Sequence, residues 1–119
     1  MLRDRFKSFG YAFKGMRHLV MQTPNARIHL FFTILVVAAG FFFEVSLSEW
    51  CVLVICIAMV FAAEAFNSAL EELTDLVSPE IHPVAGNVKD LAAGAVLFTA
   101  IGAATVGIII FLPKVLEVF

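Results

Sequence analysis

Charged residues are scarce in this sequence. Asp, Glu, Lys and Arg together make up 15% of the 119 residues, and the net charge is only −2. Hydrophobic residues make up 61%, with a mean hydropathy of +0.97. A soluble domain of this length could not bury so much apolar surface, because the usual apolar share is about 45–50%. The composition predicts a small integral membrane protein with one domain, 1–119, and no nucleic-acid partner.

Cysteine is also scarce, and the phosphate-binding loops of soluble nucleotide-binding proteins are absent. Cys51 and Cys56 stand five residues apart in an apolar run, so on a helix they point in different directions and should not form a disulfide with each other. A zinc motif would need two more cysteines. Neither G-x-x-x-x-G-K nor G-x-G-x-x-G occurs. We interpret both cysteines as side chains of a membrane helix.

Three long apolar runs predict transmembrane spans at 28–43, 50–66 and 91–112. The third run is rich in glycine and alanine, which makes it a candidate packing face between membrane helices. Before the first run, residues 1–27 place apolar side chains at spacings of three and four, with basic residues between them. This pattern is typical of a helix lying flat at a membrane surface, although a helix packed on a protein core would share it. The predicted fold is all-α.

The orientation in the membrane follows from the basic residues. The short turn 44–49 has none, Lys89 lies just before the third span, and six precede the first span. By the positive-inside rule, the N-terminus and the segment 67–90 face the cytoplasm. The six basic residues are Arg3, Arg5, Lys7, Lys14, Arg17 and Arg27.

Glu64 stands where the second span should still be inside the membrane. A carboxylate there costs about 2.5 kcal/mol or more, so its default interpretation is functional. If the helix continues, Glu71 and Asp75 lie about 20° to either side of Glu64, with Asn67 and Ser68 beside them. The sequence predicts one polar helix face rising toward the cytoplasm. Asn67 could equally be a structural contact between helices, and the acidic groups nearest the surface could be a solvated helix end.

The segment after this helix adds a basic group. Ser78-Pro79 should end the helix, His82-Pro83 and Gly86 should form a compact loop, and Lys89-Asp90 should lead into the third span. Carboxylates with a lysine at one membrane surface predict a polyanion site, since a divalent metal commonly bridges phosphate to carboxylate and lysine neutralises phosphate charge.

The sequence resembles the prokaryotic diacylglycerol kinase and undecaprenol kinase family over nearly its whole length. The resemblance lies in E-x-x-N-[ST]-x-[IL]-E-x-x-x-D starting at Glu64, then H-x(6)-KD starting at His82, then "AAGAVL", with "YAFKGMR" and "NARIHL" upstream. It implies a homotrimeric lipid kinase of the bacterial inner membrane, with a surface helix and three spans per chain. Such enzymes transfer the γ-phosphate of MgATP to a lipid hydroxyl, at a site shared between neighbouring subunits.

The resemblance also implies roles for individual residues. Glu64 is the catalytic base, Asn67 positions the base or the substrate, and Glu71 binds magnesium. A second metal-binding glutamate of many relatives falls on Thr23, a poorer ligand, so metal binding at that position is an open question. The expected nucleotide contacts are Tyr11, Glu71, Glu80, Ile81, His82, Lys89 and Asp90.

The sequence leaves two questions open. Undecaprenol is favoured over diacylglycerol as the lipid, because "NARIHL", "LSEW" and "HPVAGNVKD" resemble the undecaprenol kinase branch, but both lipids present a primary hydroxyl. The alternatives to a kinase are a small channel or transporter subunit that uses Glu64 as an ion relay, and a catalytically weakened relative.

Overall fold

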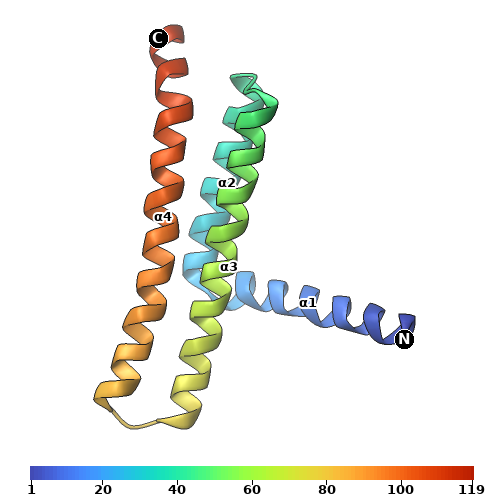
Figure 1. The fold of residues 1–119 in the computed structure, drawn as a ribbon, viewed down its shortest axis with the longest axis vertical. Helices are drawn as coiled ribbons and strands as arrows, with labels where there is room; N and C mark the ends of the chain where they lie inside the picture. The colour runs from blue at the N-terminus through green and yellow to red at the C-terminus, as the bar shows by residue number, and fades with distance from the viewer.

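The computed structural model covers residues 1–119 and consists of four helices. They are α1 (Leu2–Gln22), α2 (Pro24–Phe42), α3 (Leu47–Val77) and α4 (Pro83–Val118). Figure 1 shows α2, α3 and α4 side by side as a bundle, while α1 projects sideways from it. The three bundle helices are each long and apolar enough to cross a membrane. The prediction of an all-α membrane protein with a separate N-terminal helix is confirmed.

The bend between α1 and α2 comes from two residues. Thr23 has extended backbone angles, φ −112° and ψ 110°, and Pro24 is the first residue of α2. Proline fits the first turn of a helix and disfavours helical geometry in the residue before it. The Thr-Pro pair therefore ends the surface helix and starts the first span.

α3 begins with a capping box. The Ser46 hydroxyl accepts a hydrogen bond from the Glu49 backbone N–H at 3.2 Å, and the Glu49 carboxylate accepts one from the Ser46 backbone N–H at 2.9 Å. The helix therefore starts at Leu47, a few residues before Trp50, where the second span was expected, and Glu49 belongs to the helix. The same carboxylate lies 3.0 Å from the Lys114 ammonium, which ties the start of α3 to the end of α4.

At the opposite end of the bundle, α3 stops at Val77, directly before Ser78-Pro79, as predicted. The loop to α4 is shorter than expected. The His82 imidazole Nδ1 accepts a hydrogen bond from the Val84 backbone N–H at 3.1 Å, and Pro83 is the first helical residue. Lys89 and Asp90 therefore belong to the second turn of α4 instead of the connecting loop.

Most side chains of the single chain are exposed, and only 11 of the 119 residues are buried. The three buried polar residues, Glu64, Asn67 and Thr74, all lie on α3. The glycines of α4 at positions 94, 102 and 107 have open space around them. Because apolar side chains face outward along the bundle, they are available to lipid or to neighbouring chains.

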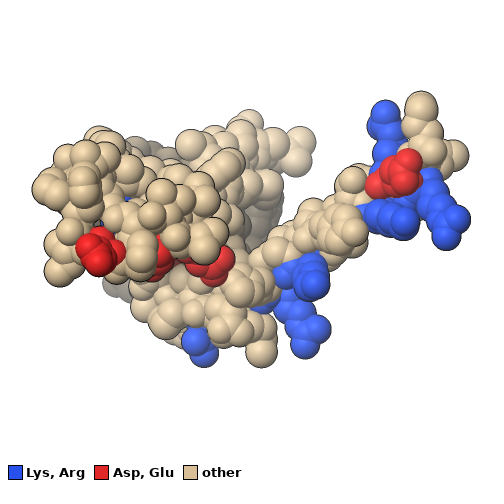
Figure 2. Space-filling model, turned by 90° about the horizontal axis from the view of Figure 1, so that it is seen from below, with Lys and Arg blue, Asp and Glu red and all other residues tan.

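The charges divide between two parts of the molecule. Seen from the end of the bundle that carries the α3–α4 loop, the Lys and Arg side chains gather mainly on α1, and acidic side chains lie on the bundle (Figure 2). Two acidic residues of α3, Glu71 and Asp75, are exposed near this end. Basic side chains of α1 and acidic side chains of α3 therefore lie on one side of the molecule, and the polyanion site stays a prediction.

Gly40 of α2 packs against Trp50 of α3. A Cβ atom built there would come within 3.0 Å of the Trp50 indole ring, which covers it. We predict that Gly40→Ala lowers the free energy of unfolding by about 1–3 kcal/mol, because the ring must shift out of its packed position. Thermal unfolding in detergent checks this, with Gly10→Ala as the control, since Gly10 has no atoms nearby. Equal stability of the two variants would contradict the packing at Gly40.

Candidate active site

Glu64 is the most completely buried polar residue of the chain. Its side chain on α3 is 1% exposed, and neither carboxylate oxygen has a hydrogen-bond partner. The nearest basic group is His29 of α2, whose Nε2 lies 3.7 Å from Glu64 Oε2. Burying a carboxylate without hydrogen bonds is unfavourable, and in this setting an ionisable group usually has a functional role. Such burial is typical of a functional carboxylate, and the role of Glu64 stays a prediction.

Asn67 is also buried on α3, but it faces a different neighbour. It lines a pocket of about 410 Å³ together with Ala92, Ala95 and Thr99 of α4, and its Oδ1 has no hydrogen-bond partner. Glu64 and Asn67 are therefore close along α3 but turn toward different helices. The predicted single polar face divides here between α2 and α4.

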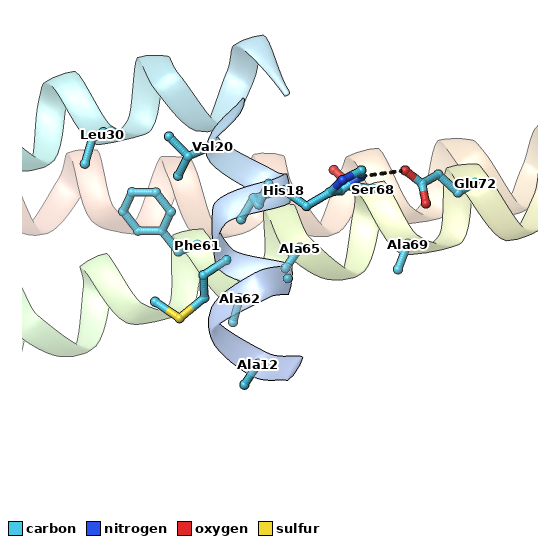
Figure 3. Close-up of a pocket in the computed structure, with 13 residues that line it drawn as sticks. Ala12, His18, Val20, Leu30, Phe61, Ala62, Ala65, Ser68, Ala69 and Glu72 are labelled. Atoms are coloured by element: carbon cyan, nitrogen blue, oxygen red, sulfur yellow. Dashed lines mark hydrogen bonds and ion pairs between the residues drawn. The ribbon is translucent and has the colours of Figure 1, made fainter. Parts of the chain in front are cut away.

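An apolar pocket of about 660 Å³ lies where α1, α2 and α3 meet (Figure 3). Ala65, which follows Glu64, is part of its wall, with Phe61 and Leu30 nearby. Its polar rim consists of Ser68 and an ion pair between His18 Nε2 and Glu72 Oε1, 3.1 Å apart. Pockets of this size and apolar lining accommodate hydrocarbon groups of small ligands.

A second, polar pocket of about 210 Å³ lies at the α3–α4 loop. It brings together four of the predicted nucleotide contacts, Glu80, Ile81, His82 and Lys89. The Lys89 ammonium donates a hydrogen bond to Asp75, which joins α3 to α4 beside the pocket. The pocket therefore brings His82 and Lys89 together with the carboxylates of Asp75 and Glu80. Lysine is a common phosphate-binding group, so a phosphate site here stays a prediction.

Three predicted nucleotide contacts lie outside this loop pocket. Asp90 lines a separate hollow on α4 with Asn87 and Leu91. Glu71 is exposed on α3, and Tyr11 is 71% exposed on α1, which leads away from α4 (Figure 1). A single chain therefore does not bring all of the predicted nucleotide contacts together in one pocket.

The structure adds residues that the sequence prediction did not include in the site. Thr74 is buried and lines the loop pocket, and its spacing of seven residues from Asn67 places it on the same side of α3. His18 pairs with Glu72, and His29 approaches Glu64. The heptad spacing could have identified Thr74, but the two histidine contacts join different helices and depend on how those helices pack.

The metal-binding prediction rests on one carboxylate in this chain. Glu71 is exposed, and the Thr23 hydroxyl lies 3.4 Å from the Ser68 hydroxyl, one turn of α3 before Glu71. No group of three His, Cys, Asp or Glu side chains could enclose a metal ion. Magnesium commonly uses one or two carboxylates together with phosphate oxygens and water. These residues fit a magnesium ion that arrives with a nucleotide, and they do not form a closed site.

These features define a class: a multi-span membrane protein with a buried carboxylate, an apolar pocket lined by the same helix and a polar pocket at one end of the bundle. The prokaryotic diacylglycerol kinase family matches residues 10–111, and the chain belongs to this family. Its membership makes the protein a membrane lipid kinase, a transferase that carries out ATP-dependent phosphoryl transfer. The channel or transporter alternative is not favoured.

Individual relatives carry two names. The chain is 37% identical over 109 residues to the undecaprenol kinase of Bacillus subtilis, covering 92% of this chain and 89% of that protein. It is 37% identical over 111 residues to the diacylglycerol kinase of Synechocystis, covering 92% of this chain and 63% of that protein. The diacylglycerol kinase of Escherichia coli is 28% identical over 95 residues, covering 80% and 78%.

Proposed function

We propose that this protein transfers the γ-phosphate of MgATP to the hydroxyl of undecaprenol, with Glu64 as the general base. The observation that carries the proposal is the burial of the Glu64 carboxylate without a hydrogen-bond partner, on a helix whose next residue, Ala65, lines an apolar pocket. A lipid hydroxyl at the membrane edge needs a proton acceptor at the same depth. We regard residues 1–119 as one lipid-kinase domain.

The choice of undecaprenol rests on how much of each relative's length aligns with this chain. The undecaprenol kinase of Bacillus subtilis matches along nearly its whole length, whereas this chain spans less than two thirds of the equally similar Synechocystis diacylglycerol kinase. The apolar pocket would accept an acyl chain as well as a prenyl chain. Diacylglycerol is therefore the second candidate.

In the proposed reaction each pocket holds one of the two reactants. The apolar pocket holds the lipid chain, and Glu64 accepts the hydroxyl proton as the lipid oxygen forms its bond to the γ-phosphorus and the bond to ADP breaks. Asn67 orients the base or the substrate, and Lys89 and the loop around His82 hold phosphate groups. Glu71 would hold Mg²⁺, which neutralises charge on the β- and γ-phosphates when bound.

The assembly is a homotrimer with active sites shared between chains. Two observations support it: Tyr11 lies on the projecting α1, apart from the loop pocket, and α4 exposes its glycines along an apolar helix. A neighbouring chain would cover both Tyr11 and the exposed glycines of α4. We predict that native mass measurement in detergent gives three chains per particle, and active enzyme that is only monomeric would contradict the shared site.

The enzyme lies in the bacterial inner membrane, with the N-terminus and the segment 67–90 in the cytoplasm. ATP is available on that side, and the basic residues of α1 and the loop pocket lie toward the same end of the molecule. The positively charged α1 helix is then placed against the cytoplasmic lipid surface.

We predict that purified protein in lipid micelles transfers labelled phosphate from ATP to undecaprenol more efficiently than to diacylglycerol, when both are assayed in parallel. Glu64→Gln should lower turnover by about 10²–10⁴-fold, because the amide cannot accept a proton at neutral pH. Thermal stability should stay the same or rise, since a buried carboxylate has been neutralised.

Each result of this assay has a distinct meaning. Faster transfer to diacylglycerol would reverse the choice of lipid. Normal turnover in Glu64→Gln would remove Glu64 as the base, and weakened assembly with activity retained would make it a structural residue. Transfer to neither lipid by well-folded protein would favour the catalytically weakened relative.

A second prediction concerns the metal. Glu71→Gln should raise the MgATP concentration needed for half-maximal activity, with partial recovery at high magnesium, because one of few carboxylate ligands is lost. Thr23→Glu should keep activity and bind magnesium more tightly, since position 23 lies beside Ser68, one turn from Glu71. Titration of activity with magnesium checks both variants. Loss of activity in folded Thr23→Glu would show that position 23 is not near the metal.

A further inference from the structure

Glu64 has one basic neighbour, and that neighbour has no role in the reaction described so far. Among all basic side chains, only His29 has a nitrogen within 4.0 Å of a Glu64 oxygen, at 3.7 Å from Oε2. The lysines nearest the ends of the bundle are occupied elsewhere, Lys89 with Asp75 and Lys114 with Glu49. His29 is 20% exposed, so most of its ring is enclosed by the surrounding helices.

His29 is held toward α3 by the packing of its own helix. Ala26, His29, Thr33, Val36 and Gly40 follow each other at spacings of three and four, and all are buried or half-buried, unlike most of α2. Such spacing marks the face of a helix that packs on a neighbour. Ala26 is fully buried, and Thr23 contacts Ser68 of α3 just before it. The direction of the His29 ring is therefore determined by the contact between α2 and α3.

We propose that His29 is the positioning residue of the catalytic base: its Nε2–H group holds one oxygen of the Glu64 carboxylate and leaves the other free for the lipid hydroxyl. This inference rests on the proposed role of Glu64. A separation of 3.7 Å is longer than a hydrogen bond, and a movement of about 0.7 Å along α2 or in either side chain closes it.

The physical reason for a positioning residue is the isolation of the Glu64 carboxylate. Neither of its oxygens has a hydrogen-bond partner, so no other group in the chain fixes the orientation of the carboxylate. A base works only when its lone pair faces the proton that it accepts, and imidazole can donate a hydrogen bond in its neutral or its charged form. After proton transfer, the neutral carboxyl group accepts this hydrogen bond less strongly, and the full contact re-forms when Glu64 releases its proton.

The test is a double-mutant cycle of His29 and Glu64, measured as labelled phosphate transferred from ATP to lipid. His29→Leu should lower kcat by about 10- to 100-fold, the effect of losing a hydrogen bond to a charged group, while KM for ATP and lipid stays unchanged. His29→Gln should keep more activity than His29→Leu, because its amide can still donate a hydrogen bond. In a Glu64→Gln background, His29→Leu should cause no further loss, since His29 acts only through Glu64.

Thr33→Val is the matched control. Thr33 lies one turn further along the same packed face, and its hydroxyl donates a hydrogen bond to the His29 backbone carbonyl at 2.7 Å, within its own helix. The control should keep the kcat of the unmodified enzyme. If His29→Leu does not assemble, His29→Gln takes its place in the cycle, with the same expectation of no further loss in the Glu64→Gln background.

The outcomes distinguish the positioning role of His29 from the role of Glu64 as the base. Unchanged kcat in assembled His29→Leu, or a loss of equal size with and without Glu64→Gln, would overturn the positioning role and leave Glu64 as the base. An altered KM with unchanged kcat would also overturn it. Full turnover in Glu64→Gln alone would overturn the role of Glu64, and with it the inference about His29.

Discussion

The structure is organised around a carboxylate that is removed from water. Glu64 sits in the middle of α3, 1% exposed and without a hydrogen-bond partner, directly after the uncharged apolar run 50–63. This is unfavourable for folding, so the surrounding helices must place the group where chemistry compensates for the cost. In the proposed reaction a lipid hydroxyl at the membrane edge provides that chemistry, because both the hydroxyl and its base can lie at the boundary between hydrocarbon and the polar surface.

The buried position of Glu64 also explains where the two pockets lie. The apolar pocket lies between α1, α2 and α3, with Ala65, the residue after Glu64, in its wall, and the polar pocket lies at the α3–α4 loop. In the proposed reaction the first holds the hydrocarbon chain and the second holds the phosphate groups. α3 connects them as one continuous helix from Leu47 to Val77. A lipid kinase must bring a water-soluble phosphate donor to an acceptor hydroxyl that is held in the membrane. A helix that reaches from the membrane to the polar surface can carry groups for both.

Much of this could be predicted from the sequence, since composition and periodicity determine which segments are membrane helices. The end of α3 at Ser78-Pro79 follows from a local rule. The sequence also predicts Glu64 and Asn67 on one polar face, whereas the packing turns the two toward different helices. α3 starts a few residues before the expected span, because Ser46 and Glu49 form a capping box that begins the helix, whereas their polar side chains predict a turn. The contact between His29 and Glu64 could not be predicted, since it depends on how α2 packs on α3. The roles of Tyr11, Glu71 and Asp90 remain predictions, because no single chain brings them to the loop pocket.

The central claim is that Glu64 accepts the proton of the lipid hydroxyl. The most direct test is the rate of phosphate transfer in a single turnover, with lipid and MgATP both saturating, so that altered binding cannot contribute. In the unmodified enzyme the labelled phosphate should appear on the lipid in one fast phase, and in Glu64→Gln that phase should slow by about 10²–10⁴-fold with its final amplitude retained. An equal rate in both proteins would contradict the account.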